Sequence, residues 1–227
     1  GGREVLQDGS CGSIGYGIAT AFAKEGANLV LTGRNVKKLE GAKELEEKYG
    51  IKVLAVPADI HAGADNEAIA ADVVKQAMDA FGRIDVLINN AGLASGLEPI
   101  DEGDPLDWDK MIDTNVKGLL YITRIVSRMM IERGQGGLIV NIGSVAGSQT
   151  YADGAVYCAS KHAVHALSEG MRIDLLKHGI KVSEVRPGMV ETEFSVVRFH
   201  GDRQRADKVY EGVKPLSAED IADVIGW

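Results

Sequence analysis

Short apolar runs alternate along the chain with longer amphipathic stretches. The apolar runs span residues 29–32, 53–56, 86–89, 138–142 and 181–185. They are nearly continuous rather than alternating, which is typical of strands buried on both faces in a parallel sheet. The intervening stretches with helical periodicity cover about residues 15–25, 36–49, 67–81, 106–132 and 154–178. Alternating strands and helices predict an α/β fold, a doubly wound Rossmann-type parallel sheet in a three-layer α/β/α arrangement.

The composition is that of a soluble globular protein and excludes several classes of partner. The 227 residues suit a single domain, which we expect to span 1–227, and the net charge of −8 argues against nucleic acid as a partner. No apolar run reaches the roughly 20 residues of a membrane helix, and the first residues have no signal-peptide core. The two cysteines form no disulfide framework. We therefore expect a cytoplasmic protein without a membrane partner.

A doubly wound sheet binds ligands at the carboxyl ends of its strands, so the residues that follow each strand are the candidates for chemistry. Glycines 9, 12 and 15 lie between a short first strand and a helix. Glycines allow the backbone to approach a pyrophosphate, and the helix N-terminus supplies N–H donors. An ordinary glycine-rich turn is an equally good interpretation of this loop by itself.

Tyr157 and Lys161 are four residues apart and so share one helix face. A phenol with a pKa of about 10 is a poor base near neutrality, but a neighbouring ammonium favours the phenolate. Such a phenol can accept a proton from an alcohol while hydride leaves, or return it to a carbonyl. Ser144, just past the 138–142 strand, is placed to hold the substrate oxygen. The same spacing at Tyr210 and Lys214 is interrupted by a glycine, and we do not assign it a role.

With these motifs in place, nearly the whole chain resembles the short-chain dehydrogenase/reductase family. Asn89-Asn90-Ala91-Gly92 is similar to the family's NNAG segment, and Ser144, Tyr157 and Lys161 match its active-site residues. The resemblance implies that Asn115 holds a water in the proton relay with Lys161. It also implies a set of cofactor-binding residues: Gly9, Ser13, Ile14, Gly15, Arg34, Asn35, Asp59, Ile60, Asn90, Ala91, Gly92, Tyr157, Lys161, Pro187, Gly188, Val190 and Thr192.

Residues 90–99 and 188–202 are similar in particular to the subgroup of NADP-dependent 3-hydroxy acid dehydrogenases. This resemblance implies reversible oxidation of L-serine, L-allo-threonine or a related 3-hydroxy acid, in a homotetramer. The glycine-containing segment around residues 9–15, called the phosphate loop below, departs from the family pattern at two positions. Asp8 replaces a threonine, and Ser13 stands where the middle glycine belongs, with Gly12 one place early.

The residue that follows the second strand favours NADP over NAD. A carboxylate there would bind the ribose hydroxyls of NAD, but the sequence has Gly33 followed by Arg34. A guanidinium is well suited to a phosphate monoester. A solvated surface arginine is the competing interpretation.

A carboxylated substrate needs a cation, and Arg198 is the candidate, together with Ser144 and Tyr157 at the reacting oxygen. Arg198 lies in a segment, about 188–214, that we expect to cover the substrate; a surface arginine is at least as good an interpretation. Other carbonyl substrates (a steroid, a sugar or an acyl-carrier-bound ketone) and a non-catalytic NADPH-binding regulator remain as alternatives. We expect no metal site, although His162, His165 and Glu169 have helical spacing that a metal site could use.

Overall fold

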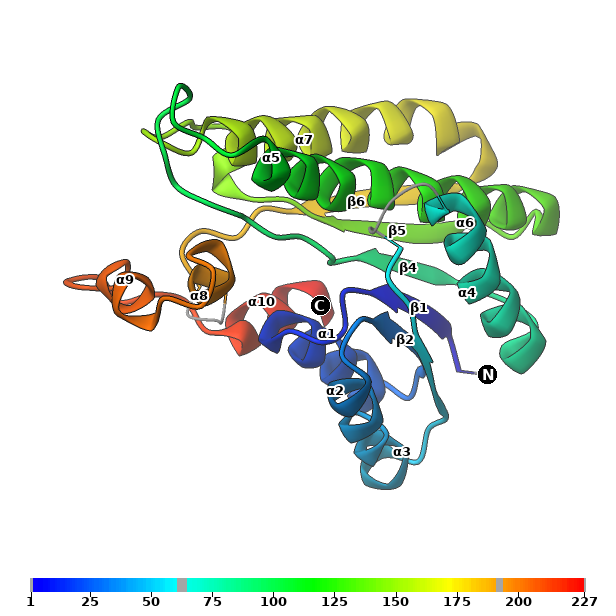
Figure 1. Ribbon diagram of the computed structural model, residues 1–227. Coiled ribbons are helices and arrows are strands. Elements are labelled where there is room, and N and C mark those ends of the chain that lie inside the picture. The colour runs from blue at the N-terminus through cyan, green and yellow to red at the C-terminus, as the bar shows by residue number, and fades with distance from the viewer. Residues whose placement is uncertain (1, 61–64, 191–193, 227) are drawn as a thin grey trace.

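The computed structural model describes residues 2–60, 65–190 and 194–226, and its centre is a six-stranded parallel sheet (Figure 1). The strands are β1 (Glu4–Asp8), β2 (Asn28–Gly33), β3 (Val53–Pro57), β4 (Val86–Asn89), β5 (Gly137–Ile142) and β6 (Ile180–Val185). Their order in the sheet is β3-β2-β1-β4-β5-β6, so the direction of winding reverses between β1 and β4. This topology confirms the predicted doubly wound, three-layer fold, and it places the switch point where a ligand is expected.

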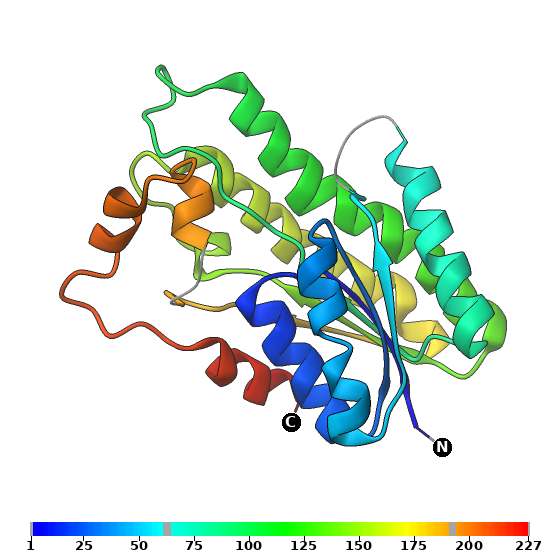
Figure 2. The ribbon, with the colours of Figure 1, turned by 60° about the horizontal axis from the view of Figure 1, so that its bottom comes forward.

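Helices cover both faces of the sheet. They are α1 (Ser13–Lys24), α2 (Val36–Gly41), α3 (Glu44–Tyr49), α4 (Asn66–Phe81), α5 (Pro105–Ile112), α6 (Leu119–Arg133), α7 (Ala155–Leu175), α8 (Phe194–Arg198), α9 (Arg203–Lys208) and α10 (Ala218–Gly226). One buried core joins α4, α6 and α7 to the sheet, and a second joins α1, α2 and α3 to the opposite face. Helix α10 packs against α1, whereas α8 and α9 lie away from the sheet (Figure 2).

Two predicted helices differ in detail from the structure. The stretch 36–49 forms two short helices, because α2 ends at Gly41 and α3 begins only at Glu44; glycine is a poor helix former. The stretch 106–132 is helical throughout, but a π-helical segment, Asp113–Gly118, lies between α5 and α6. Single π-helical turns occur often at functional sites, and this one carries Asn115.

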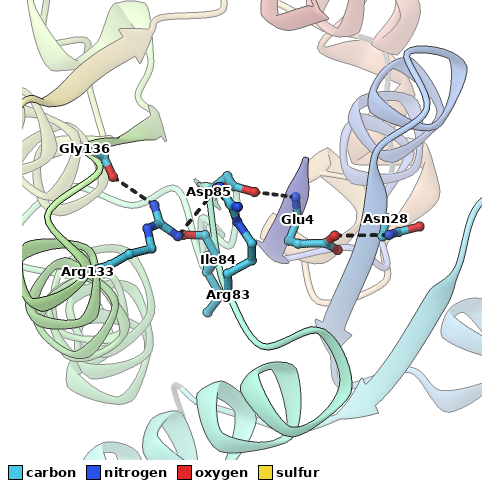
Figure 3. Close-up of polar contacts among 7 residues, drawn as sticks. All are labelled: Glu4, Asn28, Arg83, Ile84, Asp85, Arg133 and Gly136. Atoms are coloured by element: carbon cyan, nitrogen blue, oxygen red, sulfur yellow. Dashed lines mark hydrogen bonds and ion pairs between the residues drawn. The ribbon is translucent and has the colours of Figure 1, made fainter. Parts of the chain in front are cut away.

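At the amino ends of the strands, Asp85 connects several elements (Figure 3). Its carboxylate accepts hydrogen bonds from the Glu4 backbone N–H at 2.8 Å and from Arg83. Arg133 lies 3.5 Å from the same carboxylate and donates to the Ile84 carbonyl at 2.7 Å. Burial raises the pKa of Asp85, but these donors outweigh burial and hold its pKa below the usual value. The network lies at the amino ends of the strands, away from the carboxyl ends where a ligand is expected. We therefore assign it a role in the stability of the fold.

Candidate active site

A cleft opens at the carboxyl ends of β1, β2 and β4, and close backbone packing shapes its floor. Gly9 adopts a φ of +76°, and a Cβ on Gly9 would lie 2.3 Å from the Ala91 nitrogen. A Cβ on Gly15 would lie 2.2 Å from the Gly9 carbonyl oxygen. Only glycine fits at either place. Ser13 and Ile14 also line the cleft, at the start of α1. A loop that brings its backbone to a helix N-terminus in this way fits a dinucleotide pyrophosphate.

The two departures in the phosphate loop are accommodated locally. The Asp8 carboxylate accepts a hydrogen bond from the Gly9 N–H at 2.9 Å, so it is bound to its own loop. Gly12 is the N-cap of α1 with an extended backbone, and Ser13 is the first residue of that helix. The structure therefore keeps the loop-to-helix geometry without the middle glycine.

A basic cluster lies at one end of the cleft. Arg34, Lys37 and Lys38 all line it, next to Gly33. Asn35 lines it as well, but its side chain caps α2 by accepting a hydrogen bond from the Lys38 N–H at 3.1 Å. Sequence reasoning named Arg34 and Asn35 but missed the two lysines. The sequence contained a signal for them, because Lys37 and Lys38 follow Arg34 by three and four residues. This spacing places all three cations near the same end of a helix.

The other predicted cofactor residues are distributed around this cleft. Asn90, Ala91 and Gly92 line it, and the Asn90 side chain donates to the Gly9 carbonyl at 2.8 Å. After β3, Ala58 lines the cleft, whereas Ile60 is buried in the core. The cofactor role of Asp59 and Ile60 stays a prediction.

The segment that follows β6 also approaches the active site. Pro187 accepts a hydrogen bond from Val145, next to Ser144. Val190 forms an isolated bridge with Leu216. The cofactor roles of Pro187, Gly188 and Val190 stay predictions, and Thr192 lies outside the described residues.

Asn115 and Lys161 approach each other around Gly92. A Cβ on Gly92 would lie 3.1 Å from Lys161 Nζ and 3.5 Å from Asn115 Oδ1. Asn115 is buried, and its amide exchanges hydrogen bonds of 2.9 and 2.8 Å with the Leu93 backbone and donates to Ser160 at 3.0 Å. Lys161 donates to the Ile142 carbonyl at 3.1 Å. The π-helical segment thus brings the predicted relay asparagine to the predicted lysine.

Tyr157 is buried beside Ser144. Burial raises the pKa of Tyr157 to about 12, although a hydrogen bond with Ser144 opposes that rise. Burial lowers the pKa of Lys161 to about 8, and the charge of Glu184 opposes that fall. The expected phenol tuned toward neutrality by Lys161 is therefore not observed in the protein alone. The reason is that burial desolvates both groups, which disfavours the charged form of each.

Arg198 lies in a second cavity beside Tyr157. The cavity is lined by residues of the 95–104 loop, by residues of α5 that include Trp108 and Met111, by the 153–157 segment and by Arg198. Arg198 is 9% exposed; its Nε donates to the Gly96 carbonyl at 3.1 Å, and its guanidinium stacks over the Tyr151 and Tyr157 rings. Its Nη2 is buried and has no hydrogen-bond partner within the described part of the chain. Such a donor fits an anionic group of a bound molecule. Tyr151 was missed by sequence reasoning, because only the fold brings it under Arg198.

His162 and His165, whose spacing a metal site could use, form hydrogen bonds within the protein instead. His162 bonds the Cys158 carbonyl at 2.8 Å, and His165 bonds the Glu184 carboxylate at 2.7 Å. Among the described residues, no group of three histidine, cysteine or acidic side chains is arranged to hold a metal. Within the same residues, no helix combines the length and apolar character needed to cross a membrane.

Comparison with known proteins agrees with this geometry. The model of a family described as short chain dehydrogenase matches residues 4–202. The NADP-dependent 3-hydroxy acid dehydrogenase YdfG of Salmonella typhi is 43% identical over 98% of this chain and 87% of its own length. Sulfoacetaldehyde reductase 2 of Chromohalobacter salexigens is 41% identical over 97% of this chain and 86% of its own length. The closed form of serine dehydrogenase complexed with NADP+ superposes with a TM-score of 0.90 at 38% identity, covering 99% of this chain and 88% of that one.

Proposed function

The chain belongs to the short-chain dehydrogenase family, and on this premise we propose that it is an NADP-dependent oxidoreductase acting on a small 3-hydroxy acid such as L-serine or L-allo-threonine. The observation that carries the substrate class is the buried Arg198 guanidinium: Arg198 lines the cavity beside Tyr157, and its Nη2 has no hydrogen-bond partner among the described residues. A carboxylate bound there would place a nearby hydroxyl within reach of Tyr157 and Ser144. The NADP-dependence of the similar YdfG enzyme and the Arg34, Lys37 and Lys38 cluster support the cofactor.

When bound, NADP would serve as the acceptor of the hydride, and the protein's own residues transfer the proton. In oxidation, Tyr157 as phenolate takes the hydroxyl proton while the carbon–hydrogen bond breaks with its electron pair and a carbonyl forms. Ser144 holds the oxygen, and the Lys161 ammonium stabilises the phenolate. In the reverse direction Tyr157 as phenol returns the proton. The raised pKa of Tyr157 means that the protein alone holds the phenol form, which is the form that carbonyl reduction requires.

The first experiment measures initial rates of NADPH formation with L-serine, L-allo-threonine and 3-hydroxypropionate. NAD and a Tyr157→Phe variant are assayed in parallel. We expect turnover with NADP that is lost in the variant by about 10²-fold or more, because general acid–base catalysis contributes this much. NADPH binding without turnover on any carbonyl or alcohol would instead favour the non-catalytic regulator.

A second substrate class is favoured by the same guanidinium. A sulfonate, like a carboxylate, carries one negative charge on oxygens that accept hydrogen bonds from a guanidinium, and the similar protein from Chromohalobacter salexigens is named a sulfoacetaldehyde reductase. We include sulfoacetaldehyde with NADPH in the assay. Turnover of sulfoacetaldehyde without turnover of the three 3-hydroxy acids would reassign the substrate while keeping the chemistry.

We further propose that the protein is a cytoplasmic homotetramer and that residues 188–214 cover the substrate. Ile173 and Leu176, near the end of α7, are 77% and 76% exposed, which supports a further apolar contact. Phe194 and Val197 of α8 line the cofactor cleft, which supports the covering role. Light scattering after size-exclusion chromatography tests the tetramer.

A further inference from the structure

Glu184 is a buried acid on β6 that the proposed chemistry does not use. Its side chain is 2% exposed, and its backbone pairs with Asn141 of β5. One carboxylate oxygen, Oε2, lies 2.7 Å from Nδ1 of His165. The other, Oε1, is buried and has no hydrogen-bond partner within the described residues. A buried carboxylate with one unsatisfied oxygen is costly and requires an explanation.

The unsatisfied oxygen faces the backbone that holds Lys161. A Cβ on Gly143 would lie 2.3 Å from Glu184 Oε1, so the carboxylate lies directly against Gly143. Ile142, the preceding residue, provides the carbonyl that accepts the Lys161 hydrogen bond at 3.1 Å. Ser144 follows Gly143. The buried charge of Glu184 therefore lies beside the segment that positions two residues of the proposed active site.

His165 forms the outer end of this arrangement. It follows Lys161 by four residues on α7, so both side chains extend from the same helix face toward the sheet. Its Nε2 lies 3.7 Å from Glu169, whose side chain is 61% exposed. Further ionisable groups lie on the two packed elements: Tyr157, Cys158, His162, Arg172 and Asp174 on α7, and Lys181 on β6. Arg172 donates through Nε to the Val182 carbonyl at 2.9 Å. Arg186 follows β6, and its Cγ lies 3.2 Å from the position of a Gly143 Cβ.

A negative charge at this place has a use. Burial lowers the pKa of Lys161 to about 8, whereas the charge of Glu184 raises it. Without that charge the amine would lose its proton closer to neutrality, and a neutral amine cannot stabilise a phenolate.

We propose that Glu184 is a positioning residue for the reaction, whose buried carboxylate, anchored by His165, maintains Lys161 as an ammonium against the Ile142 carbonyl. The inference rests on the proposed function, because it assigns Lys161 its role there. A purely structural link between α7 and β6 is the competing explanation. The two differ in their effect on pH dependence, since a structural link changes stability but not the protonation of Lys161.

The test compares Glu184→Gln with Glu169→Gln, which removes the exposed carboxylate on the other side of His165. Initial rates of 3-hydroxy acid oxidation are measured against pH, with thermal unfolding of each variant. We expect Glu184→Gln to move the alkaline fall of kcat/KM toward neutrality by about one pH unit. Glu169→Gln should leave that fall unchanged.

Glu184→Asp keeps the negative charge but moves it away by the length of one methylene group. It should shift the alkaline fall of kcat/KM in the same direction as Glu184→Gln, but by less. It also serves if the glutamine variant does not fold. A folded variant at position 184 with the wild-type pH profile would overturn the inference while leaving the proposed function intact. Absence of any turnover in the wild-type protein would instead reject the proposed function, and this inference with it.

Discussion

The guanidinium carbon of Arg198 lies 5.5 Å from the ring centroid of Tyr157. This contact joins α8, a short helix of the 188–214 segment, to the helix that carries the proposed catalytic pair. Arg198 also exchanges backbone and side-chain hydrogen bonds with Gly96. An anion bound to Arg198 would therefore contact three segments that are far apart in the sequence, and it would lie next to the phenol that moves the proton.

Replacing Arg198 should impair recognition of the substrate's charge. We expect Arg198→Ala to raise the KM for a 3-hydroxy acid about 10- to 100-fold, because a hydrogen bond to a charged group contributes about 1.5–3 kcal/mol. Arg203→Ala, which removes an exposed arginine on α9, is the matched control. The comparison is made by steady-state kinetics. An unchanged KM in Arg198→Ala would remove the anion-binding role.

The cofactor preference should depend on Arg34. Arg34→Asp introduces a carboxylate that repels a 2′-phosphate and can bind ribose hydroxyls. We expect the ratio of kcat/KM for NADP to that for NAD to fall by at least about 10-fold and to favour NAD. Lys37 and Lys38 remain in this variant and should retain part of the NADP affinity. Unchanged selectivity in Arg34→Asp would contradict the assignment.

Two glycine-to-alanine substitutions should have opposite effects on stability. At Gly15 the new Cβ would lie 2.2 Å from the Gly9 carbonyl oxygen, so the phosphate loop must move. We expect a loss of about 1–3 kcal/mol, the usual cost of overpacking. At Gly170, inside α7, a Cβ meets no atom within 4 Å. There we expect a gain of about 0.5–1 kcal/mol from helix propensity. Denaturant unfolding measures both; equal effects would refute the packing argument.

The Asp85 network predicts a pH-dependent stability. Because the folded-state pKa of Asp85 is lowered, its contribution is fully present above the unfolded value of about 3.9. That contribution is lost as the pH falls through the lower folded-state pKa. Asp85→Asn should lower the free energy of unfolding at pH 7 by about 1.5–3 kcal/mol and less at pH 3. A loss of equal size at both values would show that the charge of Asp85 is unimportant.

The helix spanning 106–132 illustrates what a pattern can and cannot predict. Its apolar periodicity gave the correct extent, but the π-helical segment at Asp113–Gly118 left no mark in that periodicity. The exact direction of Asn115 depends on this segment. Likewise, the spacing of Tyr157 and Lys161 predicted a shared helix face but not their pKa values. Those depend on burial and on groups from other parts of the chain, such as Ser144 for Tyr157 and Glu184 for Lys161.

The sequence by itself determined the order of strands and helices, the parallel sheet, the phosphate loop, and the grouping of Ser144 with Tyr157 and Lys161. These follow from local periodicity, from glycine conformation and from the rule that parallel strands end at one edge. Only the tertiary structure decided that Asp8 is bound within its own loop and that Arg198 is buried over Tyr157. It also placed the Glu184 carboxylate against Gly143, next to the residue whose carbonyl accepts the Lys161 hydrogen bond. Burial and the distance between residues far apart in the chain set these relationships, and neither quantity is encoded in any local stretch of sequence.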